Sequence, residues 1–250
     1  MSADDGARGT LRIGTSGWHY KHWVGSFYPP RTPASKMLAF YQERFDTVEL
    51  NNSFYHLPQQ SALERWHDST PPNFCFAVKG SRFLTHMKKL KDAQAGVTKF
   101  LDAVEVLAEK LGPILFQLPP NWELDYERLR SFLEILPEYH RYAFEFRNAS
   151  WEVQEIYDLL TRYRSAHCAF DLAGYQSPIR VTTDFLYIRL HGPGNRYQGS
   201  YGDKPLRRWA ERIAAWRKQL AAVYIYFDND DSGYAAFNAA RLQEFISNRD

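Results

Sequence analysis

The chain has 250 residues, of which 44% are hydrophobic and 16% aromatic, so it can bury a sizeable core. Its 31 Lys and Arg residues nearly balance 29 Asp and Glu residues, and the net charge of +2 excludes a chain-wide field that attracts nucleic acid or an anionic membrane. The residues from Met1 to Gly9 lack the basic start and apolar stretch of a signal peptide. We expect a cytoplasmic protein without membrane association, with a flexible N-terminus over residues 1–9 and one domain over residues 10–250; its oligomeric state is left open.

Eight short segments rich in aromatic and β-branched residues predict β-strands. In chain order they are Leu11–Thr15, Thr47–Leu50, Cys75–Lys79, Ile114–Gln117, Tyr142–Glu145, His167–Phe170, Phe185–Leu190 and Val223–Phe227. Amphipathic stretches of helical length follow most of them, at Ser35–Phe45, Ser61–Asp68, Gly96–Leu111, Tyr126–Leu136, Glu152–Tyr163, Leu206–Leu220 and Tyr234–Ile246. The interval from Asp171 to Asp184 has no helical period, so we expect a loop or a single turn there. The alternation predicts an α/β fold, a TIM-type (β/α)8-like barrel with an irregular sixth crossover.

The parity of residues along the strands predicts which side chains face the barrel axis. In the fifth strand, Ala143, Glu145 and Arg147 share one side, while Phe144 and Phe146 share the other. Polar residues stand in this way at the ends of seven strands: Glu49 with Asn51, Lys79, Gln117, Glu145 with Arg147, Asp171, Arg189 with His191, and Asp228. Because the carboxyl ends of barrel strands meet at one mouth, we expect these side chains to form one site.

Two cysteines, Cys75 and Cys168, fall inside predicted strands. Their positions in these strands predict that both face away from the barrel axis as buried, reduced thiols. Their spacing matches no metal or redox motif.

Several motifs spread from the first strand to the last resemble the YecE-like family, known as domain of unknown function 72. They are Ile13-Gly14-Thr15-Ser16-Gly17-Trp18, Tyr28-Pro29-Pro30, Val48-Glu49-Leu50-Asn51-Asn52-Ser53-Phe54-Tyr55, Phe116-Gln117-Leu118-Pro119-Pro120, Phe144-Glu145-Phe146-Arg147 with Ser150-Trp151, Tyr187-Ile188-Arg189-Leu190-His191-Gly192 and Tyr226-Phe227-Asp228-Asn229. The resemblance implies a TIM-barrel-like fold and brings no established activity. Such barrels look like those of the endonuclease IV and xylose isomerase group, which suggests metal-dependent or DNA-directed chemistry by fold analogy alone.

The strand-end residues divide into candidate catalytic and candidate binding groups. For acid/base catalysis we select Glu49, Glu145 and His191, with Asp171 orienting its neighbours. For substrate binding we select Trp18, Tyr28, Asn51, Lys79, Gln117, Arg147, Arg189, Asp228 and Asn229, in which the cations form an anion cradle and Trp18 and Tyr28 form walls. The alternative for the charged residues is an internal ring of ion pairs. Lys79 could pair with Glu49, bind an anion with the help of Gln117, or form a Schiff base.

Three loops over the expected mouth carry features that bear on function. The loop at Gly14–Pro33 is rich in aromatic rings suited to stacking on a base or sugar, or to plugging the barrel. The loop at Ser81–Lys91 holds a local basic cluster that could track phosphates or could be solvated charge. The loop at His191–Pro205 is rich in Gly and Tyr, a composition that suits a lid.

Two function classes follow from these observations. The first is an enzyme that acts on a small anionic or nucleotide- or sugar-like substrate by acid/base chemistry. The second is a nucleic-acid-binding or repair-nuclease-like protein, in which the third loop tracks phosphates and first-loop rings hold an unstacked base. We predict no cofactor and select no metal ligands. A divalent metal is kept as an alternative, because several histidines and carboxylates share the expected mouth, although the inward cations oppose it.

Overall fold

The structure, a computed structural model, describes residues 8–249. Residues 1–7 of the predicted flexible N-terminus therefore lie outside the described residues. Gly9 is attached to the body of the protein, because its N–H donates to the carbonyl of Arg217 at 2.7 Å.

Nine strands of the described chain form one sheet, and eight of them match the predicted strands within a few residues at each end. They are β1 (Thr10–Thr15), β2 (Thr47–Leu50), β3 (Cys75–Lys79), β4 (Leu111–Gln117), β5 (Tyr142–Glu145), β6 (Ala166–Leu172), β8 (Phe185–Leu190) and β9 (Ala222–Phe227), with the short β7 (Tyr175–Gln176) added.

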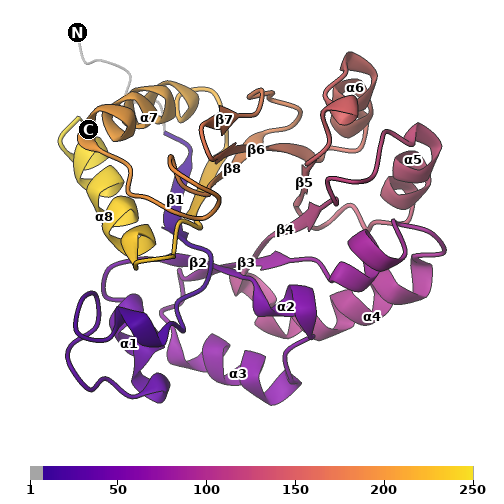
Figure 1. The fold of residues 1–250 in the computed structure, drawn as a ribbon. Coiled ribbons are helices and arrows are strands. Elements are labelled where there is room, and N and C mark those ends of the chain that lie inside the picture. The colour runs from indigo at the N-terminus through magenta and orange to yellow at the C-terminus, as the bar shows by residue number, and fades with distance from the viewer. Residues whose placement is uncertain (1–7, 250) are drawn as a thin grey trace, which may run out of the picture.

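The eight long strands pair in parallel in the order β1-β9-β8-β6-β5-β4-β3-β2. The two ends of this row, β1 and β2, approach each other through a parallel bridge between Ser16 and Glu49, where the N–H of Gly17 donates to the carbonyl of Glu49 at 2.8 Å. The sheet is therefore a nearly closed parallel barrel with helices around its outside, as Figure 1 shows. The predicted TIM-like α/β fold is confirmed.

The helices that cover the barrel lie where the amphipathic stretches predict them. They are α1 (Met37–Tyr41), α3 (Gln60–Ser69), α4 (Gln94–Val104), α5 (Tyr126–Glu134), α6 (Gln154–Arg162), α7 (Asp203–Trp216) and α8 (Tyr234–Ser247), with a short α2 (Asn52–Tyr55) that was not predicted. The predicted stretch Gly96–Leu111 does not continue as one helix, because Ala108 has a φ of 46° within a 3-10 segment that follows α4. No described helix is both long enough and apolar enough to span a membrane.

The sixth crossover is irregular, as predicted. After β6 the chain turns at Ala173 (φ 52°) and Gly174 (φ 82°), and β7 folds back antiparallel to β6. No helix forms between β6 and β8.

Side-chain parity separates two apolar clusters. Large residues such as Phe144 and Ile188 join the outer cluster beneath the helices, whereas Ala143, Tyr187 and Tyr226 join an inner cluster around the barrel axis. The prediction for the cysteines is wrong in its direction. Cys168 belongs to the inner cluster and Cys75 packs against it, because they share the parity of the inward residues of their strands. Both thiols are free, and Cys168 is buried.

Candidate functional site

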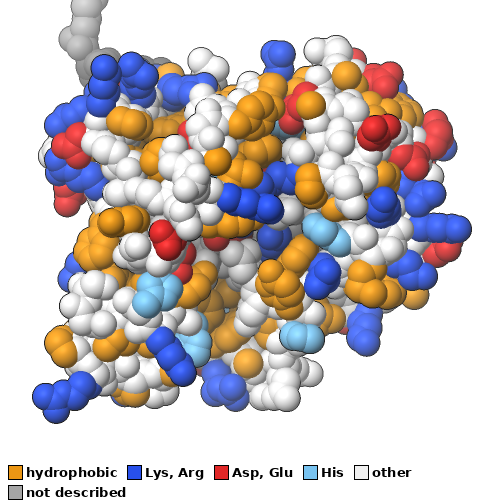
Figure 2. Space-filling model, viewed as in Figure 1, with side chains coloured by type: hydrophobic (Ala, Val, Ile, Leu, Met, Phe, Trp, Pro, Cys, Tyr) orange, Lys and Arg blue, Asp and Glu red, His pale blue; other side chains and the backbone are white. Residues whose placement is uncertain are grey.

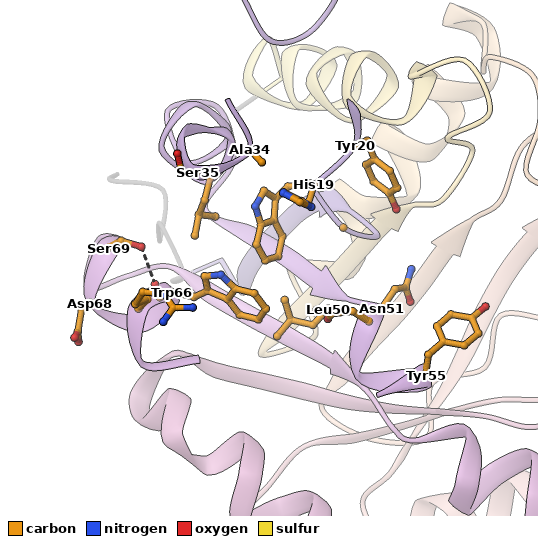
Figure 3. A pocket seen from close by; sticks show the side chains of 15 residues that line it. His19, Tyr20, Ala34, Ser35, Leu50, Asn51, Tyr55, Trp66, Asp68 and Ser69 are labelled. Atoms are coloured by element: carbon orange, nitrogen blue, oxygen red, sulfur yellow. Dashed lines mark hydrogen bonds between the residues drawn. The ribbon is translucent and has the colours of Figure 1, made fainter. Parts of the chain in front are cut away.

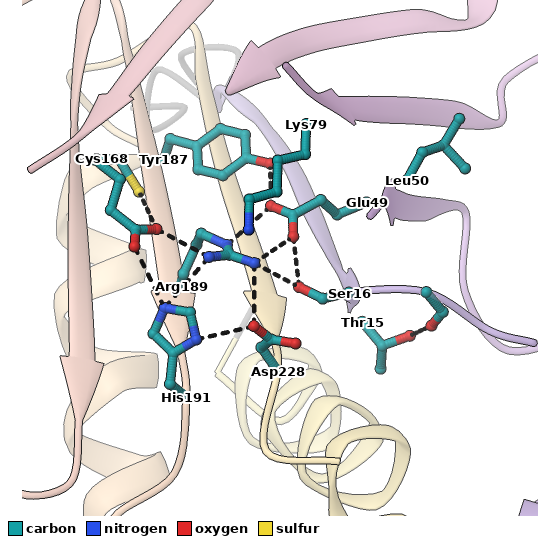
Figure 4. Close-up of polar contacts among 12 residues, drawn as sticks. Thr15, Ser16, Glu49, Leu50, Lys79, Cys168, Tyr187, Arg189, His191 and Asp228 are labelled. Carbon is teal, nitrogen blue, oxygen red and sulfur yellow. Dashed lines mark hydrogen bonds and ion pairs between the residues drawn. The ribbon is translucent and has the colours of Figure 1, made fainter. Parts of the chain in front are cut away.

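Six of the predicted residues meet at the carboxyl end of the barrel and form what we call the charged cluster: Glu49, Glu145, Arg147, Arg189, His191 and Asp228. Figure 4 shows Arg189 at its centre, with Glu49 and Ser16 on one side and His191 and Asp228 on the other. These residues come from four strands and the segments that directly follow them. Their convergence is the geometry expected of side chains that share the inward parity of parallel barrel strands.

Arg189 is fully buried and pairs with three carboxylates. Its Nε and Nη2 donate to the two oxygens of Glu49 at 3.0 and 2.7 Å, its Nη1 donates to Glu145 at 3.0 Å, and its Nη2 also donates to Asp228 at 3.1 Å. Burial opposes the charged form, but the three carboxylates outweigh it and hold the pKa of Arg189 well above its usual value. Arg189 is therefore a permanent cation whose charge the protein itself neutralises.

Glu49 is the best-satisfied acid of the cluster. Besides its two bonds from Arg189, it accepts hydrogen bonds from the hydroxyls of Ser16 and Tyr187, both at 2.6 Å. It is fully buried. With four donors around it, Glu49 has no lone pair placed to receive a substrate proton, so its geometry favours an anchoring role over the general acid or base that we considered.

Glu145 lies between two guanidinium groups. It accepts from Arg189 and from the Nε of Arg147, and the thiol of Cys168 lies 3.7 Å from its second oxygen. Burial alone would raise its pKa, but Arg147 and Arg189 outweigh burial and hold the pKa of Glu145 well below its usual range. Such a carboxylate is a weak base, so Glu145 is better suited to positioning Arg147 than to removing protons.

His191 is buried and bonded at both ring nitrogens. The Nη2 of Arg147 lies 2.8 Å from its Nε2, and its Nδ1 lies 3.0 Å from Oδ2 of Asp228. A guanidinium can only donate, so Nε2 is the acceptor and Nδ1 carries the proton toward Asp228. The orientation of His191 is therefore set by a carboxylate at Nδ1 and by guanidinium groups at Nε2, since Nη1 of Arg189 also lies 3.4 Å from Nε2.

Asp228 is the acid of the cluster that reaches toward solvent. Its side chain is 16% exposed, whereas those of Glu49 and Glu145 are 0% exposed. Burial raises its pKa, but Arg189 and the hydrogen bond from His191 prevail and lower it.

Lys79 extends from the end of β3 toward the cluster but forms no ion pair with any described residue (Figure 4). Within residues 8–249 its ammonium has no hydrogen-bond acceptor, and Nζ lies over the ring of Phe54, 4.4 Å from its centroid. Burial, reinforced by the charge of Arg189, lowers the pKa of Lys79 to about 8. The salt bridge to Glu49 that we considered from the sequence does not form.

A second set of cations surrounds His86, which lies in the loop after β3 and packs edge-on against Phe54 with ring centroids 5.0 Å apart. Burial and then the charges of Lys79, Arg82 and Arg147 lower the pKa of His86 to about 4. Three cations therefore lie close enough to His86 to act on it. The basic loop Ser81–Lys91, which we expected over the mouth, thus reaches it through His86.

Two amides among the predicted residues stand at the mouth without partners. Gln117 ends β4 as a buried residue, and no described residue hydrogen bonds to its side chain. Asn51 follows β2, and its side-chain oxygen is buried and unpaired. Both stay candidates for ligand contact.

Four other predicted residues lie away from the charged cluster. Asp171 shares the outward parity of Ala169; its carboxylate contacts the hydroxyl of Tyr201, and burial raises its pKa, so it cannot orient the cluster. Asn229 is buried and donates to Gly199 and Asn238, which ties the loop after β8 to α8.

Tyr28 lies in the core of the first loop, where its hydroxyl donates to the carbonyl of Trp18 at 2.6 Å, so it supports this loop rather than forming a wall. Trp18 does line a cavity, although its side chain is largely buried.

That cavity is a mostly apolar pocket of about 990 Å³ between the first loop, α2 and α3, next to the charged cluster (Figure 3). The ring of Trp18 packs edge-on against Trp66 of α3, with centroids 5.0 Å apart, and both line the pocket together with Tyr20, Asn51 and Tyr55. Figure 2 shows the corresponding face of the molecule hollowed near its centre, with acidic, basic and histidine side chains around the hollow.

Several residues of the site were missed in the sequence analysis. Ser16 and Tyr187 hold Glu49, and Phe170 lies under Arg147, 4.6 Å from ring centroid to guanidinium carbon. The parity rule predicts all three, because they follow or share the inward face of β1, β8 and β6. Trp66 lies on a helix, and no strand-end rule would have identified it.

The arrangement does not resemble a metal centre. Within the described residues no three His, Cys, Asp or Glu side chains are grouped so that they could hold a metal ion. The carboxylates of the cluster are already engaged by Arg147 and Arg189, and these cations would repel a metal.

Comparisons with known proteins identify relatives over nearly the whole chain. The family model described as "Protein of unknown function DUF72" matches residues 12–250. The UPF0759 protein YunF of Bacillus subtilis is 26% identical over 94% of both chains, and the UPF0759 protein YecE of Escherichia coli is 29% identical over 55% of this chain and 48% of its own. A solved DUF72 family protein of Thermotoga maritima has a TM-score of 0.87 at 28% identity, covering 95% of this chain and 99% of its own. A second, from Enterococcus faecalis, has the same fold, with a TM-score of 0.79 at 20% identity over 95% of this chain and 96% of its own.

Proposed function

The chain belongs to the DUF72 family, and from the geometry of its own barrel mouth we propose that it is an enzyme that binds a small anionic substrate and performs acid/base chemistry on it. The observation that carries this proposal is Lys79, whose side chain is largely buried at the mouth while its ammonium has no hydrogen-bond acceptor among residues 8–249. A cation that has lost most of its water and has no hydrogen-bonded counter-ion favours an anionic ligand that would pair with it.

The anion site lies on the side of the mouth formed by β3 and β5. Lys79, Arg82 and Arg147 all act on His86, and Arg147 keeps its Nη1 without a hydrogen bond to any described residue. Ammonium and guanidinium groups together suit a carboxylate or a phosphate. Gln117, unpaired at the end of the neighbouring strand β4, adds an amide to the same side.

The base in this proposal is His191. Its Nδ1–H donates to Asp228, which would stabilise the imidazolium formed when Nε2 takes a proton. Nη2 of Arg147 lies 2.8 Å and Nη1 of Arg189 3.4 Å from Nε2. An anion that draws Arg147 toward itself removes the shorter of these two contacts, so binding of the substrate would make the base more available. The proposal involves no metal or cofactor.

Binding and turnover test the two halves of the proposal separately. Sulfate and a panel of sugar phosphates, nucleotides and small carboxylates are titrated into the protein, with thermal shift and calorimetry as readouts and product detection by NMR. We expect Lys79→Met to weaken anion binding by about tenfold or more, whereas Lys99→Met on the exposed face of α4 has no effect. We expect His191→Gln to keep binding and to lose about 100-fold or more of any turnover. Equal anion affinity in wild type and Lys79→Met would refute the proposed site.

A second candidate function is nucleic-acid binding through the loop after β3. Two observations favour it. Phe83 and Met87 are 45% and 68% exposed, beside the exposed cations Arg82 and Lys88. The loop also reaches the mouth through His86. Rings and cations in alternation suit a single strand.

A further inference from the structure

A pocket next to the charged cluster has no part in the chemistry proposed above. It has a volume of about 990 Å³, within the usual range for small-molecule sites, and it lies between the first loop, α2 and α3. It adjoins the cluster through the backbone, because Ser16, which donates to Glu49, precedes the pocket residue Gly17, and Glu49 itself precedes the pocket residue Leu50. A ligand in the pocket therefore lies beside the cluster.

The walls of this pocket are aromatic. Trp18 and Trp66 form an edge-on pair with an interplanar angle of 87°, and Tyr20 and Tyr55 line the pocket as well. In Figure 3, Tyr20, Asn51 and Tyr55 lie toward one end and Trp66 toward the other. Tyr55 is 63% exposed, so its ring is accessible to a ligand in the pocket. Walls of this kind favour a flat ring as the occupant.

Asn51 supplies a polar group that a ligand in this pocket could hydrogen bond. Its Oδ1 is buried without a partner, and its Nδ2 also has no partner within residues 8–249. An unsatisfied buried amide oxygen is destabilising, so it favours a ligand with an N–H donor. A side-chain amide pairs in two places with a base edge that carries a donor beside an acceptor. A fatty chain would leave Asn51 unpaired.

Tyr20 connects the pocket to the acids of the mouth. It lines the pocket, its hydroxyl donates to the carbonyl of Ser16, and its surroundings include the charges of Asp228 and Glu49. A ring in the pocket would therefore lie against one side of Tyr20, with the charged groups of the mouth near the other.

We infer that this pocket binds a nucleobase, held between aromatic rings and paired with the amide of Asn51, and that the substrate of the barrel is a nucleotide whose phosphate reaches Lys79 and Arg147. The base site follows from the pocket alone. The assignment of the phosphate rests on the proposed function.

The test compares adenosine 5′-monophosphate, adenosine, ribose 5-phosphate and benzyl phosphate by calorimetry and by the fluorescence of the pocket tryptophans. We expect the nucleotide to bind at least about tenfold more tightly than ribose 5-phosphate, because only the nucleotide carries a base. Benzyl phosphate, whose ring has no N–H, should bind more weakly than the nucleotide. Asn51→Leu should remove the difference between these two.

The variants separate this inference from the proposed function. Trp66→Ala should lower nucleotide affinity to that of ribose 5-phosphate, whereas Trp216→Phe on the distant α7 should leave it unchanged. Lys79→Met should weaken nucleotide binding but not adenosine binding. Circular dichroism and thermal melting check that each variant folds, and Trp66→Leu, which removes the ring but keeps an apolar side chain, replaces any Trp66→Ala protein that does not.

Each outcome of these experiments supports or refutes the base site, the anion site or both. If ribose 5-phosphate and the nucleotide bind equally, the base site is wrong while the anion site stands. If adenosine binds and phosphate adds nothing, the base site stands and the proposed anion site is wrong. If none of the four probes binds to wild-type protein, both are wrong.

Discussion

Arg189 and Glu49 form a fully buried two-pronged ion pair, with N–O distances of 3.0 and 2.7 Å, that joins β8 to β2 across the inside of the barrel. The two residues are 140 positions apart in the chain. Because β1 and β2 are connected by little more than one bridge, this pair holds together the part of the barrel where the sheet is least complete. The cluster is thus partly a structural ring and partly a site.

Replacing Arg189 should destabilise the protein strongly. Arg189→Met leaves Glu49 and Glu145 buried without their cation, and breaking a buried pair in this way costs about 3–5 kcal/mol. Urea unfolding followed by circular dichroism measures the loss. Arg241→Met, which removes an exposed pair with Asp203, is the control and should change little. Unchanged stability in Arg189→Met would mean that the ring does not hold the barrel together.

Stability should fall in acid through Glu145 and Asp228. Both have a folded pKa below the unfolded value, so the stability that they contribute is fully present above the unfolded pKa, near 4, and is lost as pH falls through the folded pKa. The difference in unfolding free energy between wild type and Glu145→Gln should therefore narrow from about pH 6 to about pH 3. A difference that stays constant over this range would contradict the depressed pKa. Glu43→Gln, at an exposed position, is the control.

Anion binding should weaken in mild alkali because of Lys79. Its pKa is lowered to about 8 by burial and by Arg189, so the ammonium loses its proton as pH rises through that value. Sulfate keeps a constant charge there, and its affinity should fall by about tenfold between about pH 7 and about pH 9. Lys79→Arg keeps its charge and should bind sulfate independently of pH in this window. The same slope in both proteins would remove Lys79 from the anion site.

The two thiols should be unreactive in the folded protein. Burial, reinforced by Glu145, raises the pKa of Cys168 well above its usual value, and burial raises that of Cys75 to about 11. Because the thiolate is the reactive form, a disulfide reagent should modify both only as fast as the protein unfolds. Rapid modification of Cys168→Ser protein in native buffer would show that Cys75 is accessible. Rapid modification of Cys75→Ser protein would show the same for Cys168.

Nucleic-acid binding through the third loop predicts a steep salt dependence. If Arg82 and Lys88 contact phosphates, affinity for single-stranded DNA should fall by about tenfold or more from about 50 to about 200 mM salt, and alanine at both positions should reduce the slope. Fluorescence anisotropy measures both effects. No measurable binding at the lower salt concentration rejects this candidate.

Much of the site was predictable because strand periodicity is a local property. Alternation along Tyr142–Glu145 predicted that Glu145 faces the axis, and the same rule predicted Lys79, Arg189 and Asp228. It failed at Asp171. The inward positions of β6 are Ala166 and Cys168, and Asp171 lies an odd number of residues from both, so it has the outward parity. The neighbouring Phe170, which lies under Arg147, was therefore missed.

The sequence by itself determined the strand–helix alternation, the barrel and the set of charged groups at its mouth, since each depends on periods of a few residues. Only the tertiary structure decided that Arg189 neutralises Glu49 and Glu145, that Lys79 is left without an acceptor among the described residues, and that Trp66 of α3 meets Trp18 beside Asn51. The reason is physical. Pairing among charges and rings depends on distances across the barrel between segments far apart in the chain, and no local pattern encodes those distances.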